Sequence, residues 1–245
     1  MKRTITTRSA HFACSALGLL AFFAGAASAE ENPDALKQQI LAQARTVSPD
    51  DYAFTRTVRA EQIDGEKTEK HVIVERFDPT KPAAQRWTFV SIDGRSPSAS
   101  ELKNYVKTTA KRRVISYGRL AEFFGERATV KASPPGHTIF SFAALPKGTA
   151  VVRDIDLSAD ASADAIVNTE GPIPFVEEVR ITSAKPTRVK LIALIERWET
   201  STHYRLLPNG KPVPAEQVTD VTGSMLGKHG SIRSTISYTD LRAVR

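Results

Sequence analysis

The sequence predicts a mainly β fold with helices, in which one curved antiparallel sheet, or an incomplete barrel, is covered by helices. One observation is a series of long extended runs near the end of the chain, at 187–200, 202–207, 213–225 and 231–241. Asn209-Gly210 lies between two of these runs, and Asn-Gly favours a tight hairpin turn. A second observation is an amphipathic helical pattern at 32–46, which must lie on an apolar surface.

The first 29 residues have the pattern of a secretory signal peptide. Basic residues near the start precede an apolar run at 12–23, and Ala27-Ser28-Ala29 is a small-residue cleavage site, so cutting is expected between Ala29 and Glu30. An uncleaved anchor is the alternative, although the run is shorter than the roughly 20 residues of a membrane span. We therefore expect an exported, periplasmic protein with one domain at 30–245.

Composition limits the chemistry of that domain. The single cysteine, Cys14, lies in the expected signal peptide, so no disulfide, thiol nucleophile or cysteine metal site is expected after it. Without the signal's three basic residues, 31 basic and 27 acidic residues remain, a net charge of +4. This mild excess permits contact with anionic lipid or an acidic partner and does not indicate nucleic-acid binding.

The first half of the chain predicts a helix followed by a sheet. A helix is expected from 32 to about 46, with an apolar stripe that is either a plain packing face or the underside of a mobile lid. Strands follow at 51–63, 67–77 and 85–92, with a hairpin turn at Asp64-Gly65. The stripe residues are Leu36, Ile40, Leu41 and Ala44.

The middle of the chain predicts a second helix and further strands. Ser98 and Glu101 form a capping-box pattern that begins a helix running to about 113, and 118–124 adds a helical turn. Residues 158–164 are expected to be an acidic loop, and the order of strands looks like a sequential meander. The expected strands are 127–132, 138–144, 155–157, 165–168 and 175–182.

Signatures of enzymes are weak or missing, so we expect no catalytic activity, metal or cofactor. Ser100 and Lys103 match the S-x-x-K pattern of penicillin-binding enzymes without its companion motifs, and the capping box accounts for the same serine-rich segment. The histidines after residue 30 are far apart in sequence, which does not favour a metal site. Four aspartates between 154 and 164 lack the glycine and glutamate of a calcium loop.

Basic residues recur every four positions on the second expected helix and continue beyond it. They form either a solvated face or a docking surface for anionic lipid or an acidic membrane partner. The docking candidates are Lys103, Lys107, Lys111, Arg112 and Arg113.

The stretch 189–198 is apolar in both phases of strand alternation. Either one face packs under a helix while the other lines a cavity, or a bulge switches the phase midway, or both faces are simply packed. One phase holds Val189, Leu191, Ala193 and Ile195, and the other holds Ile192, Leu194 and Trp198.

Together these features resemble the superfamily of periplasmic lipoprotein carriers and acceptors typified by LolA, LolB and RseB. The resemblance rests on the strand start Tyr52-Ala53-Phe54, on the hairpin at 204–214 with its Asn209-Gly210 turn, and on the closing segment 236–241, Ile-Ser-Tyr-Thr-Asp-Leu. It implies an unclosed antiparallel barrel with a helical lid and a cavity for acyl chains. It also implies a lid-related arginine in an early strand, for which Arg56 and Arg59 are the candidates.

We therefore expect a non-enzymatic, monomeric carrier that holds the acyl chains of a lipid or lipoprotein and can contact inner- or outer-membrane envelope proteins. An RseB-like sensory or protein-binding module without lipid is the alternative, and a periplasmic hydrolase is a third hypothesis. Residues expected in the cavity or core are Phe54, Val58, Trp87, Phe89, Phe140, Phe142, Phe175, Ile195, Tyr204 and Ile236.

Overall fold

The computed structural model describes residues 32–245 except 110–113, 125–127, 144, 153–154, 190–192 and 245. The expected signal peptide lies outside the described residues. Residues 32–245 form one compact unit. Within the described residues, no helix combines the length and the apolar character that a membrane span requires.

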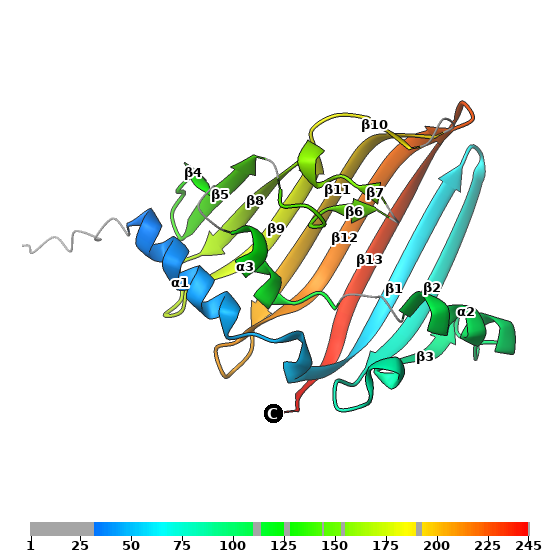
Figure 1. The fold of residues 1–245 in the computed structure, drawn as a ribbon, viewed down its shortest axis with the longest axis horizontal. Coiled ribbons are helices and arrows are strands. Elements are labelled where there is room, and N and C mark those ends of the chain that lie inside the picture. Colours follow the sequence, from blue (N-terminus) through cyan, green and yellow to red (C-terminus); the bar gives the residue numbers. More distant parts are fainter. Residues whose placement is uncertain are drawn as a thin grey trace, which may run out of the picture. The chain divides into compact units, whose positions relative to one another are not determined.

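An antiparallel sheet dominates this unit (Figure 1). Its order in the described residues is β3-β2-β1-β13-β12-β11-β9-β8-β5-β4, with β10 paired to β11. The strands are β1 Tyr52–Asp64, β2 Lys67–Phe77, β3 Trp87–Ile92, β4 Thr129–Ala132, β5 His137–Ala143, β8 Ala161–Asn168, β9 Phe175–Ser183, β10 Thr187–Val189, β11 Ala193–Leu206, β12 Pro212–Met225 and β13 Lys228–Ala243. The predicted fold class, a mainly β protein with an open antiparallel sheet and covering helices, is confirmed.

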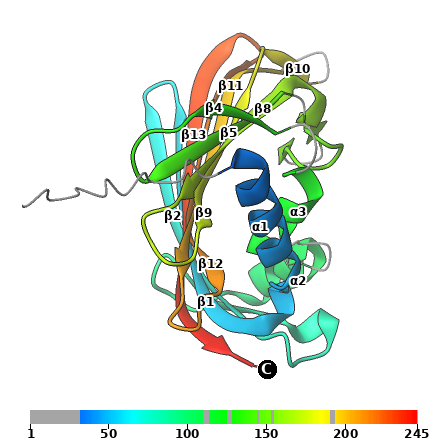
Figure 2. The ribbon, with the colours of Figure 1, turned by 90° about the vertical axis from the view of Figure 1, so that its left-hand side faces the viewer.

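The helices and a small hairpin complete the unit. They are α1 Pro33–Arg45, α2 Ala99–Thr109, α3 Leu120–Phe123, the 3₁₀ turns η1 Pro49–Asp51, η2 Ala83–Gln85, η3 Tyr117–Arg119 and η4 Ser158–Asp160, and the pair β6 Val151–Val152 and β7 Ile155–Asp156. Figure 2 shows α1, α2 and α3 on the same side of the sheet, which we call the inner face.

The strand order differs from a purely sequential meander at one place. β1 pairs with β13, so the first and last strands are neighbours in the middle of the sheet. β3 and β4, which follow each other in the chain, consequently lie at opposite edges. The segment between them contains α2, η3 and α3, and it must pass from one edge to the other. This passage places the helical segment over the inner face.

The segment 187–206 also differs from the prediction. It is not one strand to 200 and another from 202, because β10 folds back on β11 and β11 then runs unbroken to Leu206. Register shifts between Ile195 and Arg197 and between His203 and Tyr204 are bulges in β11. The first bulge brings both Ile195 and Trp198 to the inner face, where both join the apolar core. A bulge of this kind switches the phase of alternation, which accounts for the inward position of both Ile195 and Trp198.

Residues 161–164 are the start of β8 rather than a loop. Alternate residues Ala161, Ala163, Ala165 and Val167 are all buried, and the residues between them are half-buried. Alanine is a weak strand former, but its small side chain fits beneath the phenylalanines of β5, to which β8 pairs. Packing therefore extended the strand beyond what local propensity indicates.

Local signals set the helices and turns. The predicted α1 stripe is confirmed, since Leu36, Ile40 and Ala44 are fully buried in the main core. The capping box of α2 is also present. The Ser98 amide donates to Glu101 Oε2 at 2.7 Å, and the Glu101 amide donates to Ser98 Oγ at 3.3 Å. In the turn at 208–210, Gly210 takes a positive φ of 75°.

Candidate functional site

The inner face is filled with side chains at the end where α1 and α3 lie. Phe140 and Phe142 of β5 are buried against Phe124, with ring centroids 5.1 and 5.3 Å apart. Phe175, Ile195 and Tyr204 pack at the margin of the same core. These side chains form the main apolar core beneath α1 and α3.

Tyr117 of η3 fixes the covering helices to the sheet. Its hydroxyl donates to Gln43 Oε1 of α1 at 2.9 Å and accepts from the Val176 amide of β9, also at 2.9 Å. Its ring meets Tyr204 edge-on, with centroids 5.2 Å apart. Burial raises the pKa of the Tyr117 phenol well above its usual value, so the group stays neutral and able to donate. Of the two readings of α1, these contacts favour the packing helix.

A second, smaller cluster lies where β1, β2, β3 and β13 meet. Phe54, Phe77 and Tyr238 are buried there, with Trp87 and Ile236 packed against them. Val58 lies further along the same face of β1, opposite Ile73 of β2 and Ile236 of β13, and is half-buried. Four of the predicted cavity residues therefore lie in or beside one aromatic cluster.

The early-strand arginines have different surroundings. Arg56 lies on the inner face of β1, its Nη1 3.5 Å from Oε2 of the buried Glu75 and its guanidinium carbon 5.5 Å from the ring centre of Trp87. Arg59 is exposed on the other face. Of the two candidates for a lid-related arginine, only Arg56 faces the side that the helices cover.

The inner face is hollow at the opposite ends of the long strands. A cavity of about 300 Å3 lies between β7 and the ends of β11, β12, β13 and β1. Of the ten residues predicted for the cavity or core, Ile195 lines it, and so do Ala193 and Leu194 of the apolar stretch 189–198. Sequence reasoning missed the other apolar lining residues, Ile63, Ile155, Val221, Met225 and Ile232.

Two glycines form part of the cavity wall and face each other across β12 and β13. A Cβ on Gly223 would lie 2.2 Å from the carbonyl oxygen of Leu194, and one on Gly230 would lie 2.7 Å from that of Ile63. Neither position has room for a side chain, so the backbones approach closely. A glycine inside a strand pattern indicates such an approach, and Gly223 within the expected strand 213–225 was the available signal.

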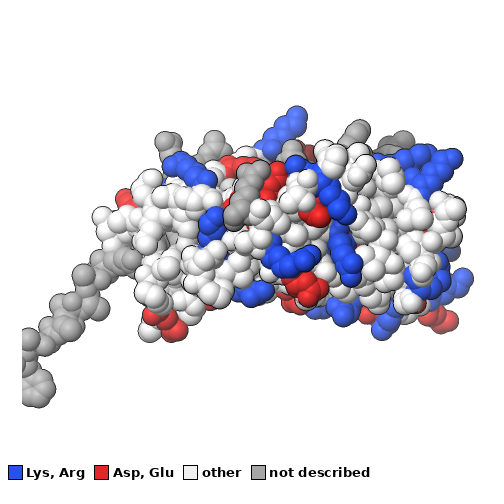
Figure 3. Space-filling view, turned by 90° about the horizontal axis from the view of Figure 1, so that it is seen from below, with Lys and Arg blue, Asp and Glu red and all other residues white. Residues whose placement is uncertain are grey.

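The predicted docking surface is partly described. Lys103 and Lys107 are exposed on α2, whereas Lys111, Arg112 and Arg113 lie outside the described residues. Leu102 and Val106 are exposed beside the two lysines, at 43% and 59%. Seen from below the view of Figure 1, Lys and Arg side chains stand out from a mostly uncharged surface, with fewer Asp and Glu among them (Figure 3).

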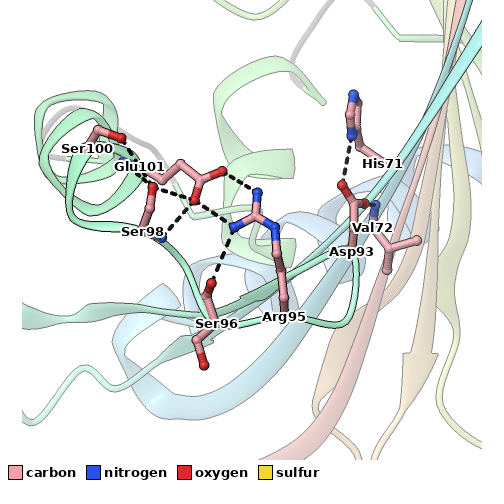
Figure 4. Close-up of polar contacts among 8 residues, drawn as sticks. All are labelled: His71, Val72, Asp93, Arg95, Ser96, Ser98, Ser100 and Glu101. Carbon is pink, nitrogen blue, oxygen red and sulfur yellow. Dashed lines mark hydrogen bonds and ion pairs between the residues drawn. The ribbon is translucent and has the colours of Figure 1, made fainter.

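A polar network anchors α2 to the β3 edge of the sheet (Figure 4). Arg95 forms two short contacts with Glu101, at 2.7 and 2.9 Å, and Ser98 donates to the same carboxylate. These hydrogen bonds, from Arg95 first and then Ser98, hold the pKa of Glu101 far below its usual value. On the inner side Tyr105 stacks on Phe89, with ring centroids 4.7 Å apart. These contacts join the start of α2 to the segment after β3 and the middle of α2 to β3 itself.

No cluster of three or more metal-ligating side chains occurs among the described residues. Ser100 lies at 3.1 Å from Ser98 within the capping region. The histidines are dispersed over the sheet, each beside a carboxylate or a hydroxyl: His71 with Asp93, His137 with Glu177, His229 with Glu196, and His203 with Ser201.

Comparison with models of protein families and with curated proteins gives no match. Among solved structures, the chain is similar to a LolA superfamily protein from Nitrosomonas europaea. The two are 15% identical over 85% of this chain and 94% of the other, with a TM-score of 0.34. The description of the fold rests on the strands and helices themselves.

Proposed function

We propose that this protein binds an acyl chain of a lipid or lipoprotein in the periplasm, in the cavity between β7 and the ends of β11, β12, β13 and β1. The observation that carries the proposal is the aliphatic lining of that cavity, with Ile155, Ile195, Val221 and Ile232 among its residues. Concave apolar sites of this kind suit apolar ligands. The charged and polar side chains that also line it are Gln62, Asp64, Ser224, Lys228 and Ser231.

The size of the cavity sets the size of the ligand. Its volume of about 300 Å3 is at the lower end of the usual range of ligand pockets, about 300–1,000 Å3. It therefore suits a segment of one chain better than the several chains of a complete lipoprotein anchor. Each buried methylene contributes about 0.8 kcal/mol, so even a partly inserted chain gains measurable affinity.

The exposed apolar residues at the hairpin tip beside the cavity support the entry of an acyl chain from an apolar phase. Met225 and Leu226 are 61% and 74% exposed, and Ile63 on the adjacent hairpin is 39% exposed. Met225 and Ile63 also line the cavity, so its apolar surface continues to the outside of the protein. Leu226 holds a positive φ of 52° in the turn with Gly227. A leucine is an unusual choice there, where asparagine or glycine is favoured.

Mass spectrometry of protein purified from periplasm under native conditions tests the proposal. We expect copurified lipid, released by organic extraction, and a thermal shift on adding back a fatty acid that increases with chain length. A protein that carries no lipid and shows no shift that depends on chain length would refute the acyl-binding function.

A second candidate function, an envelope protein-binding module without lipid, is favoured by α2. Its exposed side combines Leu102 and Val106 with Lys103 and Lys107, a mixed apolar and basic surface suited to an acidic partner. Affinity capture from envelope extract would compare the wild type with K103E/K107E and with K67E/K81E, a matched pair of exposed lysines elsewhere. Partner loss in the first variant alone, with no bound lipid in any of them, would favour this function over acyl binding.

A further inference from the structure

A second concavity lies away from the apolar cavity, and its lining is basic. It is an open groove of about 860 Å3 between the end of α1, the start of β3 and the η3–α3 segment. Arg45, Arg86, Arg119 and Lys147 line it. Arg45 is in the last turn of α1, Arg86 directly precedes β3, Arg119 is in η3 and Lys147 is in the loop after β5. Only the fold brings these four residues together.

The positive charges of the groove exceed its negative charges. Two carboxylates line it, and each belongs to a pair: Arg86 with Asp50 at 3.0 Å, and Arg119 with Glu122 at 3.7 Å. Arg45 and Lys147 form no ion pair among the described residues, although Asp156, which does not line the groove, is near enough to Lys147 for the charge of the lysine to help lower the pKa of that carboxyl. The described lining therefore has four cations and two anions, an excess of two positive charges in one concavity.

Arg119 is only partly satisfied in this arrangement. Its Nε is buried and has no hydrogen-bond partner among the residues that the structure describes, and its contact with Glu122 is longer than a hydrogen bond. A buried donor left unpaired costs free energy, and a guanidinium is suited to bind the oxygens of a phosphate. An anion bound on the groove side of Arg119 would be attracted by the positive charge of the guanidinium, and this attraction would offset the cost of its unpaired Nε.

The groove also has an apolar side. Val47, Phe77, Trp87 and Val114 line it beside the cations. A small inorganic ion would leave these side chains unused, whereas a phosphate ester with an organic substituent would contact both kinds of surface.

We propose that this groove is a binding site for a phosphate ester, either the head group of an anionic phospholipid or a soluble phosphorylated compound. The groove and the acyl cavity share no lining residue. The proposal for the groove therefore does not depend on acyl-chain binding.

Calorimetric titration with two probes distinguishes the two sources. Monomeric dihexanoyl phosphatidylglycerol and sn-glycerol 1-phosphate are titrated into the full protein, with dihexanoyl phosphatidylcholine as the zwitterionic control. Binding of the phosphatidylglycerol alone assigns a lipid head group, and equal binding of glycerol phosphate assigns a soluble ester. Saturable binding of neither anionic probe would overturn the proposal. Phosphatidylglycerol that binds no more tightly than phosphatidylcholine, together with no binding of glycerol phosphate, would also overturn it.

Variants locate the binding in the groove. R45E/K147E replaces two exposed cations that have no ion-pair partner in the described part of the chain, and we expect affinity to fall about tenfold or more. E122Q removes a competing carboxylate, and we expect binding to tighten about two- to fivefold, a gain that misfolding cannot produce. K103E/K107E, with the same charge change on α2, should keep the wild-type affinity. An equal loss in K103E/K107E, or no change in R45E/K147E and E122Q, would also overturn the proposal.

Discussion

Arg56 and Glu75 face each other across β1 and β2 on the inner face, with Nη1 3.5 Å from Oε2. Glu75 is only 2% exposed, and Arg56 also lies over Trp87. A carboxylate this deeply buried is tolerated because cationic and hydrogen-bonding groups compensate for its lost hydration. The pair thus brings a charged interaction into an otherwise aromatic cluster.

Replacing Arg56 with methionine should destabilise the protein. The change keeps most of the side chain's volume but removes the positive charge beside Glu75, and we expect a loss of about 2–4 kcal/mol in the free energy of unfolding. Arg59→Met, an exposed position on the same strand, should change stability by less than about 0.5 kcal/mol. Urea denaturation of both variants checks this, and similar effects in both would contradict a structural role for the Arg56–Glu75 pair.

Gly223→Ala should also be costly. The added Cβ would lie 2.2 Å from the Leu194 carbonyl oxygen, so β11 and β12 must move apart. We expect a loss of about 1–3 kcal/mol, the usual cost of overpacking. Gly171→Ala is the control, because nothing lies within 4 Å of that position. Thermal unfolding of the two variants side by side measures the difference, and an unchanged midpoint for Gly223→Ala would show that the strands separate easily.

The contribution of Glu101 to the anchoring of α2 should depend on pH. Its pKa is lowered in the folded protein, so the stabilisation is fully present above the ordinary value of 4.5 and is lost as pH falls further below it. Glu101→Gln should remove this acid-sensitive part of the stability of α2. We expect the wild type and Glu101→Gln to differ in hydrogen exchange of α2 at pH 7 and to converge as the pH falls toward 2. A difference that stays constant over this range would exclude the carboxylate as the cause.

Ala193→Phe should fill the apolar cavity and block it. Ala193 lines the cavity, and we expect acyl-chain binding to weaken about tenfold or more if the ligand occupies that space. Thr222→Phe places the same ring at an exposed position on the neighbouring strand and serves as the control. Displacement of a fluorescent fatty acid measures both. Unchanged affinity in Ala193→Phe would show that the acyl chain binds outside this cavity.

Leu226→Asn should separate stability from uptake. Asparagine tolerates the positive φ of this turn better than leucine does, so we expect a gain in stability of about 0.5–1 kcal/mol. The same change removes the most exposed large apolar side chain beside the cavity, and uptake of lipid from vesicles should slow several-fold. Stopped-flow transfer and thermal unfolding measure the two effects. A more stable variant with wild-type uptake would show that the tip has no part in entry.

The predictions of helices and turns that rest on local signals in the sequence agree with the structure. The α1 stripe, the Ser98–Glu101 capping box and the turns at Gly65 and Gly210 depend on residues close together in the chain. The bulge after Ile195 was one of several readings of the apolar pattern, and only pairing with β12 decides between them. The limits of the cavity could not be predicted, because it depends on how closely Gly223 and Gly230 bring the backbones together.

The sequence by itself determined an antiparallel, mainly β protein with covering helices, because alternation, capping and turn chemistry act over a few residues. The tertiary structure decided that β1 pairs with β13, and so that the helical segment between the edge strands crosses the inner face. It also decided where that face is filled and where it is hollow, and it gathered Arg45, Arg86, Arg119 and Lys147 around one groove. These outcomes depend on contacts between residues far apart in the chain and on empty space, which no single residue specifies.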